Sequence, residues 1–376
     1  MSAPPSALEV TRQLLRFDTI NPPGQERSCA EYLGRLLEGG GFEVGFYEFA
    51  EARTSLVARL GGSDDRPPLC FTGHIDTVPL GAQPWSADPF SGEIEDGKLY
   101  GRGSSDMKSG VAAFVIAALG LARLSRAAGG LVLVITAGEE TGCEGAYHLA
   151  RLGAVLGRAG AIVVGEPSSN QPFVGHKGAL WLEARTKGVT AHGSMPGKGI
   201  NAIYKAARAV GKLEDFGFNV APHPHLGAPT LNVGTIRGGM NINSVPDESV
   251  ITIDIRTVPG QTHESLSDML ASELGEEVEI SSLVDVEGVW TDPRNPWMED
   301  VFAIMTDILG EPPGIRTATY FTDASVLTPA YGGVPTVILG PGEAEMAHQT
   351  DEYCHVERIE QAVEAYRRVA RAWCGF

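Results

Sequence analysis

The residues of this sequence best suited to chemistry are histidines and carboxylates that follow short apolar runs. His74 and Asp76 follow the run "LCFTG", and the adjacent Glu139 and Glu140 follow the run "LVLVITAG". Imidazole nitrogens and carboxylate oxygens together suit hard to borderline divalent metal ions. These residue types therefore predict a metal site whose ligands come from strand ends.

Three further polar clusters fit the same site. They contain Asp106 in "GRGSSDMKSG", Glu166 in "VVGEPSS" and His348 in "MAHQTDEY". Ligands of open parallel sheets bind outside the carboxyl ends of the strands, so we expect these clusters to meet at one place. Two histidines and three carboxylates exceed what one zinc ion with an open position needs. They match two metal ions, each with its own histidine and carboxylate, that share one further carboxylate.

The adjacent glutamates are expected to divide two roles, one as a metal ligand and the other as a base. A metal ion lowers the pKa of its bound water from about 15.7 toward about 7, and a nearby carboxylate can accept the proton. Such a base typically contributes roughly a hundred- to ten-thousand-fold in rate. Neighbouring residues of a regular strand point to opposite faces, so Glu139 and Glu140 are expected on the turn after the strand. Asp76 is on the same side as His74 in an extended chain and can hold the ring of His74 from behind.

The elements that carry these residues follow an α/β pattern. Continuous apolar runs at residues 130–136 and 161–164 are typical of strands covered on both faces, and residues 109–124 are predicted to form a helix too apolar to be exposed. The glycines around Asp106 allow a tight turn before that helix, and a carboxylate is favoured near a helix start. The sequence therefore predicts an α/β domain with a largely parallel sheet and helices on both faces.

The pattern changes in the middle of the chain. Residues 179–188 and 249–260 alternate apolar and polar side chains, whereas residues 201–216 and 262–275 have the period of amphipathic helices. A sheet with helices on one face only accounts for both features. We therefore predict an inserted α+β domain at 179–289, with residues 1–178 and 290–376 forming the catalytic, metal-binding domain.

Composition excludes several classes of partner. The 376 residues carry 29 basic and 47 acidic side chains, a net charge of -18 that repels nucleic acids and anionic membranes and favours small molecules or metal cations. The start of the sequence does not resemble a signal peptide, and no stretch reaches the roughly 18 uninterrupted apolar residues that a spanning helix needs, so we expect a cytoplasmic protein. The five scattered cysteines indicate neither a disulfide framework nor a thiolate zinc site.

Five motifs in order give the sequence a family resemblance. The motifs "GHIDTVP", "GRGSSDMKSG", "TAGEETG", "GEP" and "AHQTDEY" resemble those of the co-catalytic zinc amidohydrolases and peptidases. That family includes acetylornithine deacetylase, succinyl-diaminopimelate desuccinylase, aminoacylase and glutamate carboxypeptidase. The resemblance covers essentially the whole chain, and Glu166 and "AHQTDEY" look closest to the deacetylase and desuccinylase branch.

The resemblance implies a role for each motif residue. It implies two divalent metal ions per chain, with zinc as the expected metal and cobalt or manganese as alternatives. It also implies that Glu139 is the base and that Asp76 supports His74. The implied ligands are His74 and Glu166 on one ion, Glu140 and His348 on the other, and Asp106 between them.

The inserted segment resembles the family's lid or dimerisation domain, which implies a homodimer. His192 would reach a neighbouring active site and support the oxyanion, although it could also be a lid-surface histidine. Arg256 has the planar fork that suits a substrate α-carboxylate, but an ordinary surface ion pair explains it equally well. Asn243 is a further substrate-binding candidate or a cap of the turn before Pro246. The turn "YFTDAS" resembles the family's loop that contacts the substrate carboxylate, which makes Thr322 a further candidate for substrate binding.

The resulting hypothesis is a metal-dependent hydrolase of amino-acid metabolism. It would cleave the amide bond of an N-acyl amino acid in the manner of a deacetylase or desuccinylase, with a metal-bridging water as nucleophile and Glu139 as general base. Two alternatives stay open. One is a dipeptidase or carboxypeptidase of the same chemistry that acts on short peptides, and the other is a non-catalytic, metal-binding regulatory protein.

Overall fold

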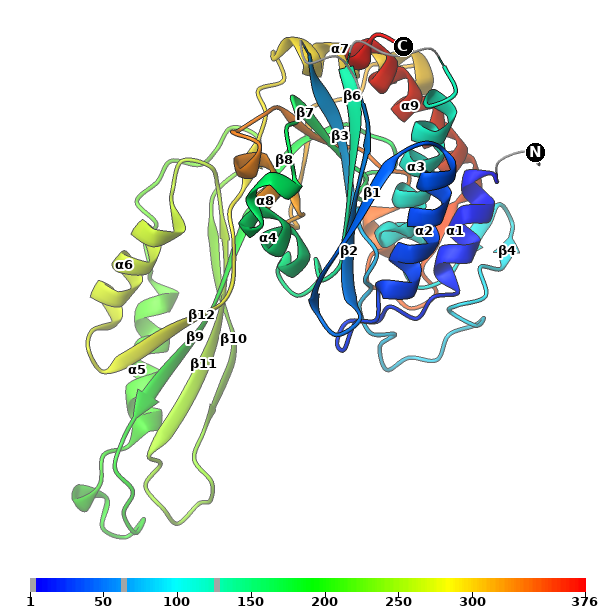
Figure 1. Cartoon of the computed structure of the whole chain (residues 1–376). Helices are drawn as coiled ribbons and strands as arrows, with labels where there is room; N and C mark the ends of the chain where they lie inside the picture. Colours follow the sequence, from blue (N-terminus) through cyan, green and yellow to red (C-terminus); the bar gives the residue numbers. More distant parts are fainter. Residues whose placement is uncertain (1–4, 62–65, 125–128) are drawn as a thin grey trace. The chain divides into compact units, whose positions relative to one another are not determined.

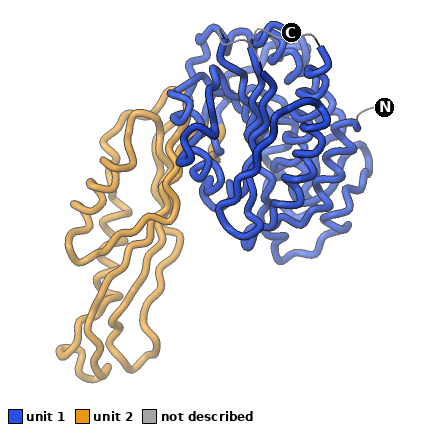
Figure 2. Tube along the Cα trace, viewed as in Figure 1, with its two compact units in different colours: residues 1–175, 290–317, 322–376 blue, residues 176–289, 318–321 orange. Residues whose placement is uncertain are grey.

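The computed structural model describes residues 5–61, 66–124 and 129–376. Two compact units divide the chain (Figure 2): unit 1 has residues 1–175, 290–317 and 322–376, and unit 2 has residues 176–289 and 318–321. The predicted catalytic ranges 1–178 and 290–376 include residues 1–4, 62–65 and 125–128, which lie outside the described residues. Catalytic and lid roles for the two units stay a prediction.

A large mixed sheet forms the centre of unit 1 (Figure 1). Strands β6, β3, β7 and β15 are parallel neighbours, whereas β1, β2 and β8 pair antiparallel. The prediction of a sheet with a largely parallel core is therefore confirmed. Among the described residues its order is β1 (Glu43–Ala50), β2 (Arg53–Leu60), β6 (Gly129–Thr136), β3 (Arg66–His74), β7 (Ala161–Val164), β15 (Thr336–Ile338), β8 (Phe173–His176) and β13 (Val289–Trp290), with β14 (Arg316–Ala318) paired to β8.

Helices cover both faces of this sheet, as the continuous apolar strands predict. Every residue of β6 and β7 is buried, because neither face of these strands meets water. One face carries α1 (Ala7–Leu15), α2 (Arg27–Gly39), α3 (Ser109–Leu121) and α9 (Val356–Cys374), with α7 (Pro296–Leu309) beside α9. The other face carries α4 (Glu144–Arg151) and α8 (Ala324–Ala330).

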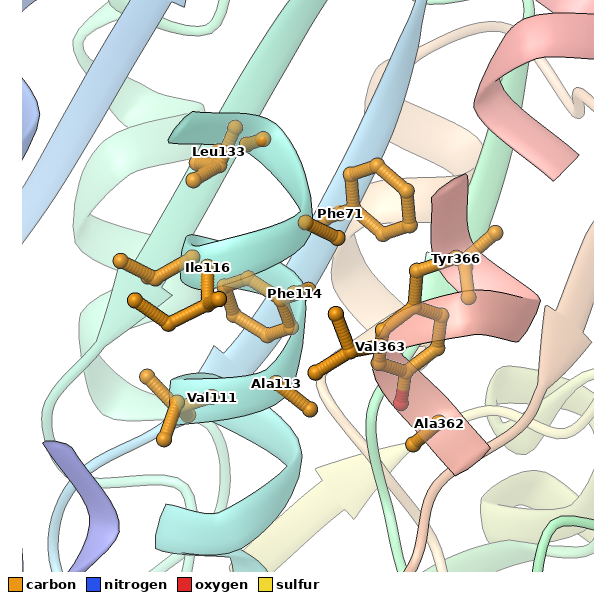
Figure 3. Close-up of a cluster of buried hydrophobic side chains, with 14 of the residues drawn as sticks. Phe71, Val111, Ala113, Phe114, Ile116, Leu133, Ala362, Val363 and Tyr366 are labelled. Atoms are coloured by element: carbon orange, nitrogen blue, oxygen red, sulfur yellow. The ribbon is translucent and has the colours of Figure 1, made fainter. Parts of the chain in front are cut away.

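Aromatic side chains join β3, α3 and α9 into one core (Figure 3). Phe71 on β3 lies 5.9 Å from the Phe114 ring of α3 and 5.5 Å from the Tyr366 ring of α9. Full burial of such a side chain contributes about 1.5–3 kcal/mol. Residues 104–121 are long and apolar enough to cross a membrane, but 89% of them are buried inside the fold, as in the core helix of a soluble protein.

Unit 2 is an α+β layer. Its antiparallel sheet has the order β10 (Thr230–Gly238), β11 (Glu248–Thr257), β9 (Gly178–Lys187) and β12 (Val278–Val286). Helices α5 (Ala202–Glu214) and α6 (His263–Leu274) pack on one face, where Leu182, Ile253 and Leu266 are buried. The one-sided burial explains the alternating pattern, and the prediction of a sheet with helices on one face is confirmed.

A small third sheet ties two loops of unit 1 together. It has the order β16 (Tyr353–His355), β5 (Lys98–Tyr100) and β4 (Ile94–Glu95) among the described residues. Its strands are antiparallel, with Tyr353 opposite Tyr100. The loop after β5 carries Asp106 and the loop before β16 carries His348, so this sheet holds together two segments about 240 residues apart in the chain.

Candidate metal centre

Three parallel strands end beside one another and present four of the predicted site residues. His74 is the last residue of β3, Glu139 and Glu140 lie on the turn after β6, and Glu166 follows β7. Because β3 pairs in parallel with both β6 and β7, these side chains gather at the carboxyl edge of the sheet.

Asp106 and His348 come from two loops. Asp106 lies in the segment Ser104–Lys108 just before α3, with non-helical backbone angles of φ -117° and ψ 93°. Gly103 turns the chain there with φ 87°, a value that glycine adopts without strain. His348 follows β15 and has φ 63°.

The carboxylate of Asp106 lies between the two histidines. Its Oδ1 is 3.2 Å from Nε2 of His74, and its Oδ2 is 3.4 Å from Nε2 of His348. His74 also lies 3.6 Å from Oε1 of Glu166, and His348 lies 3.1 Å from Oε2 of Glu140. Five side chains thus form two halves, each with one histidine and one carboxylate, on either side of Asp106.

Glu139 lies next to this arrangement. Its Oε2 is 3.9 Å from Nε2 of His74, and its other oxygen is buried without a hydrogen-bond partner. By distance alone, Glu139 groups with His74 and Glu166 as possible ligands, while Asp106 and Glu140 form a second group with His74. The distances therefore allow Glu139 to be a ligand or a base, and its role as a base stays a prediction.

Asp76 holds both His74 and the glutamate turn. Its carboxylate accepts the backbone N–H groups of Glu139 and Glu140, both at 3.2 Å, and the side-chain amide of Asn21 at 3.0 Å. Nδ1 of His74 is 3.0 Å from the backbone oxygen of Asp76 and 3.5 Å from its carboxylate. A proton on Nδ1 leaves Nε2 free to bind a metal ion.

Burial and crowding shift the acid–base properties of the cluster. Burial raises the pKa of Glu139 and of Glu166 well above the usual range, against the lowering effect of His74. Burial lowers the pKa of His74, but Glu166 and the other carboxylates around it outweigh this and raise it well above 6.5. Hydrogen bonds to Asp106 and Glu140 raise the pKa of His348 to about 10. The crowded carboxylates therefore favour positive charge beside them.

The side chains fit divalent metal ions. The donors are imidazole nitrogens and carboxylate oxygens, the set that suits zinc, cobalt or manganese. Oε1 of Glu139 and Oε1 of Glu140 are buried without a hydrogen-bond partner, which is costly unless a cation satisfies them. Bound cations would also supply the positive charge that the carboxylates favour.

His192 and Asn243 lie together in unit 2. His192 forms an isolated antiparallel β-bridge with Ser244, and the N–H of Gly193 donates to the backbone oxygen of Asn243 at 2.7 Å. The His192 ring is exposed, and its Nδ1 is 2.8 Å from the hydroxyl of Ser194. Among the described residues, Nε2 of His192 makes no hydrogen bond.

Arg256 and Thr322 already have partners. Nε of Arg256 pairs with Asp254 at 2.9 Å, and its guanidinium lies 5.7 Å from the Trp181 ring. The ordinary ion pair that was the alternative explanation for Arg256 is thus present in unit 2, with Asp254 as the partner. In unit 1 the hydroxyl of the buried Thr322 accepts the N–H of Ala324 at 3.1 Å, at the start of α8.

The structure adds buried residues that the sequence analysis did not single out. Asn21 donates to both Asp76 and Thr141, and Asp323 accepts the hydroxyl of Thr136 at the end of β6. Glu352 binds the loop of Asp106. Glu352 stands inside the quoted motif "AHQTDEY", but Asn21 gave no signal beyond the turn-forming "NPPG" that contains it.

Comparison with known proteins gives a consistent result. Residues 70–372 match the sequence model of Peptidase family M20/M25/M40. An acetylornithine deacetylase of Proteus mirabilis is 32% identical, with 98% of this chain and 97% of that protein aligned. A probable succinyl-diaminopimelate desuccinylase of Staphylococcus epidermidis is 30% identical, with 97% of each chain aligned.

A solved structure is similar over the whole length. An M20 family metallo-carboxypeptidase from Sulfolobus solfataricus superposes with a TM-score of 0.84, covering 99% of this chain and 100% of that chain. The two sequences are 18% identical, so this similarity concerns the fold.

Proposed function

The chain belongs to Peptidase family M20/M25/M40, and from this premise we propose that it is a metal-dependent amidohydrolase that releases the acyl group of an N-acyl amino acid. The observation that carries the proposal is the carboxylate of Asp106 between His74 and His348, with Glu139 beside it. Relatives named acetylornithine deacetylase and succinyl-diaminopimelate desuccinylase, about 30% identical over nearly the whole chain, support the deacylase type.

Five side chains would hold two divalent metal ions, for which we propose zinc, with cobalt or manganese as alternatives. His74 and Glu166 form one half, His348 and Glu140 the other, and Asp106 serves both. When bound, such ions polarise a carbonyl oxygen and lower the pKa of water.

Glu139 would move the proton. Its buried carboxylate accepts a proton from the attacking water as the water oxygen bonds to the scissile carbonyl carbon. Burial raises the pKa of Glu139, which makes it a better proton acceptor than an exposed glutamate. As the carbon–nitrogen bond breaks, Glu139 gives this proton to the leaving nitrogen, so the products are a carboxylate and a free amine. Asp76 keeps Glu139 in place through its backbone N–H.

Unit 2 would complete the site as a lid and dimerisation domain. We propose that His192 of one protomer donates a hydrogen bond to the oxyanion in the neighbouring protomer, with Asn243 beside it. Met240 and Ile242, in the same loop as Asn243, are 93% and 103% exposed, which supports burial of this loop by a second copy. Arg256 would exchange Asp254 for the substrate α-carboxylate, and Thr322 stays the remaining candidate for substrate binding.

The alternatives are a dipeptidase or carboxypeptidase of the same chemistry and a metal-binding regulatory protein without turnover. The name of the similar Sulfolobus structure is consistent with the first of these. We propose a cytoplasmic location, since a soluble enzyme of this kind would meet its small substrate there.

Hydrolysis of a substrate panel tests the proposal. The panel contains N-acetyl, N-succinyl and N-formyl amino acids and dipeptides, each assayed with protein of measured metal content and with zinc, cobalt or manganese added. We expect zinc-dependent release of amine from one acyl class, and none from the Glu139→Ala variant at equal metal content. Turnover of dipeptides alone would favour the peptidase. No turnover by a metal-loaded protein would refute the enzyme proposal.

A further inference from the structure

We propose that Glu352 is a positioning residue that fixes Asp106 in the metal site and joins its loop to the loop of His348. The inference rests on the proposed function, because it gives Asp106 the central place among the metal ligands. It concerns how this chain builds the ligand geometry, and it needs no assumption about the substrate.

The side chain of Glu352 is completely buried and accepts hydrogen bonds along the whole loop of Asp106. Its Oε1 accepts the backbone N–H groups of Ser105 at 2.8 Å and of Asp106 itself at 2.9 Å. Its Oε2 accepts the N–H of Gly103 at 2.9 Å and Nη1 of Arg102 at 2.7 Å. Both carboxylate oxygens are therefore used, and one bond ends on the backbone of a proposed ligand.

These bonds matter because the Asp106 loop lacks the support of a regular helix. Asp106 precedes α3 and has non-helical angles, so its N–H belongs to the backbone donors that a helix start leaves unsatisfied. An anionic acceptor is the favoured partner for such donors. Without Glu352, the buried N–H groups of Ser105 and Asp106 would have to find new acceptors, and the loop would move.

The same residue connects the loop of His348. Glu352 is four positions after His348, and its backbone oxygen accepts the N–H of Gly101 at 2.9 Å. The hydroxyl of Ser105 donates to the backbone oxygen of Tyr353 at 2.6 Å. The segments 101–106 and 348–353 are thereby held together by backbone and side-chain bonds, and two proposed ligands depend on one connection.

Arg102 makes the position of Glu352 rigid. Arg102 is 1% exposed, donates to the backbone oxygen of Pro79 at 3.1 Å and lies 5.2 Å from the ring of Trp85. A buried carboxylate that accepts three backbone N–H groups and one guanidinium N–H has little freedom to move. Glu352 is therefore a fixed anchor for Asp106 rather than a mobile surface acid.

The chain offers a matched control. Glu26 is also completely buried and paired with an arginine, Arg53, at 3.0 Å. Its side-chain hydrogen bonds go to Arg53, and none of those described reaches the backbone of a proposed ligand. A general loss of stability would appear in both Glu26→Gln and Glu352→Gln, whereas an effect on the metal site is expected only in Glu352→Gln.

The test compares zinc retention and amide exchange in the full-length, zinc-loaded chain. Glutamine has one acceptor oxygen, so in either orientation its NH₂ group faces two of the four donors that Glu352 now accepts. We expect Glu352→Gln to lose zinc to a competing chelator at an affinity about 10- to 100-fold weaker than wild type. We also expect the amides of Ser105 and Asp106 to exchange faster, while Glu26→Gln keeps zinc affinity within about twofold.

A second variant guards against a folding defect. Glu352→Asp retains the charge that neutralises Arg102 but is one methylene shorter, so it should fold and still bind zinc more weakly than wild type. Zinc affinity and amide exchange equal to wild type in Glu352→Asp, or equal losses in Glu26→Gln, would overturn the inference. Weaker zinc binding with no turnover by the wild-type protein on any substrate would uphold Glu352 and reject the proposed function.

Discussion

Replacing Asp76 with asparagine should destabilise the protein by several kcal/mol, although the two side chains have the same shape. Oδ2 of Asp76 accepts the amide of Asn21 and the N–H of Glu140, and Oδ1 accepts the N–H of Glu139 and faces Nδ1 of His74. In either orientation of the asparagine, its NH₂ group faces two of these donors. Each hydrogen bond to a charged acceptor contributes about 1.5–3 kcal/mol, so the loss should be roughly 3–6 kcal/mol.

The ionisation of Asp76 agrees with the direction of this effect. Burial opposes the charged form, but the hydrogen bonds from His74, Asn21 and the Glu139 backbone lower the pKa of Asp76 overall. A lowered pKa means that the fold stabilises the charged carboxylate, despite the other carboxylates nearby. The asparagine variant loses this stabilisation and gains unsatisfied donors.

Urea unfolding at neutral pH with a chelator present measures the effect without a contribution from metal binding. The matched variant Asn21→Ala removes one donor to Asp76 and should cost less, since the two backbone N–H bonds remain. If the free energy of unfolding of the Asp76→Asn variant is within about 1 kcal/mol of that of wild type, the turn of Glu139 and Glu140 does not depend on this carboxylate.

Three further predictions concern separate parts of the molecule. Glu139→Gln should lower kcat about 10²- to 10⁴-fold at unchanged zinc content, and full activity in steady-state assays would remove Glu139 from the mechanism. Phe114→Ala should lower the free energy of unfolding by about 3–5 kcal/mol, because it opens a cavity between Phe71 and Tyr366, and urea titration measures this. Burial, the charge of Asp76 and the opposing Arg53 leave Glu26 with a pKa of about 7 in the folded chain. The contribution of Glu26 to the free energy of unfolding is therefore fully present below pH 4.5 and is lost as the pH rises through about 7. A plot of the free energy of unfolding against pH should fall in this range with a slope of up to about 1.4 kcal/mol per pH unit. The Glu26→Gln variant should lack this slope.

The sequence predicted the architecture well, because hydrophobic patterning determines it. Continuous apolar runs became the buried strands β6 and β7, and alternating runs became β9 and β11, with one face against α5 and α6. Each pattern depends only on which faces of a strand meet water. Residues 318–321 also belong to unit 2, although they follow a long segment of unit 1. The sequence did not predict this, because so short a segment shows no hydrophobic period.

The polar contacts behind the site could not be predicted in the same way. Asn21 meets Asp76 across 55 positions, and Glu352 meets Asp106 across 246 positions. A hydrogen bond between distant residues leaves no periodic trace, and an isolated Asn or Glu is usually an exposed residue. The motif residues at the ends of β3, β6 and β7 were easier to find, because the ends of parallel strands converge whatever the detailed packing.

The adjacent glutamates show how a single turn serves both halves of the site. On a regular strand Glu139 and Glu140 would point to opposite faces of the sheet, and one of them would lie in the apolar core. Positive φ angles at Gly138 and Gly142, 76° and 109°, instead bend the chain into a turn. Because Asp76 binds the N–H groups of both glutamates, the two side chains project from one fixed backbone, Glu139 toward His74 and Glu140 toward His348. The different directions of the two side chains thus follow from where one buried carboxylate holds the main chain, and the proposed division of roles rests on them.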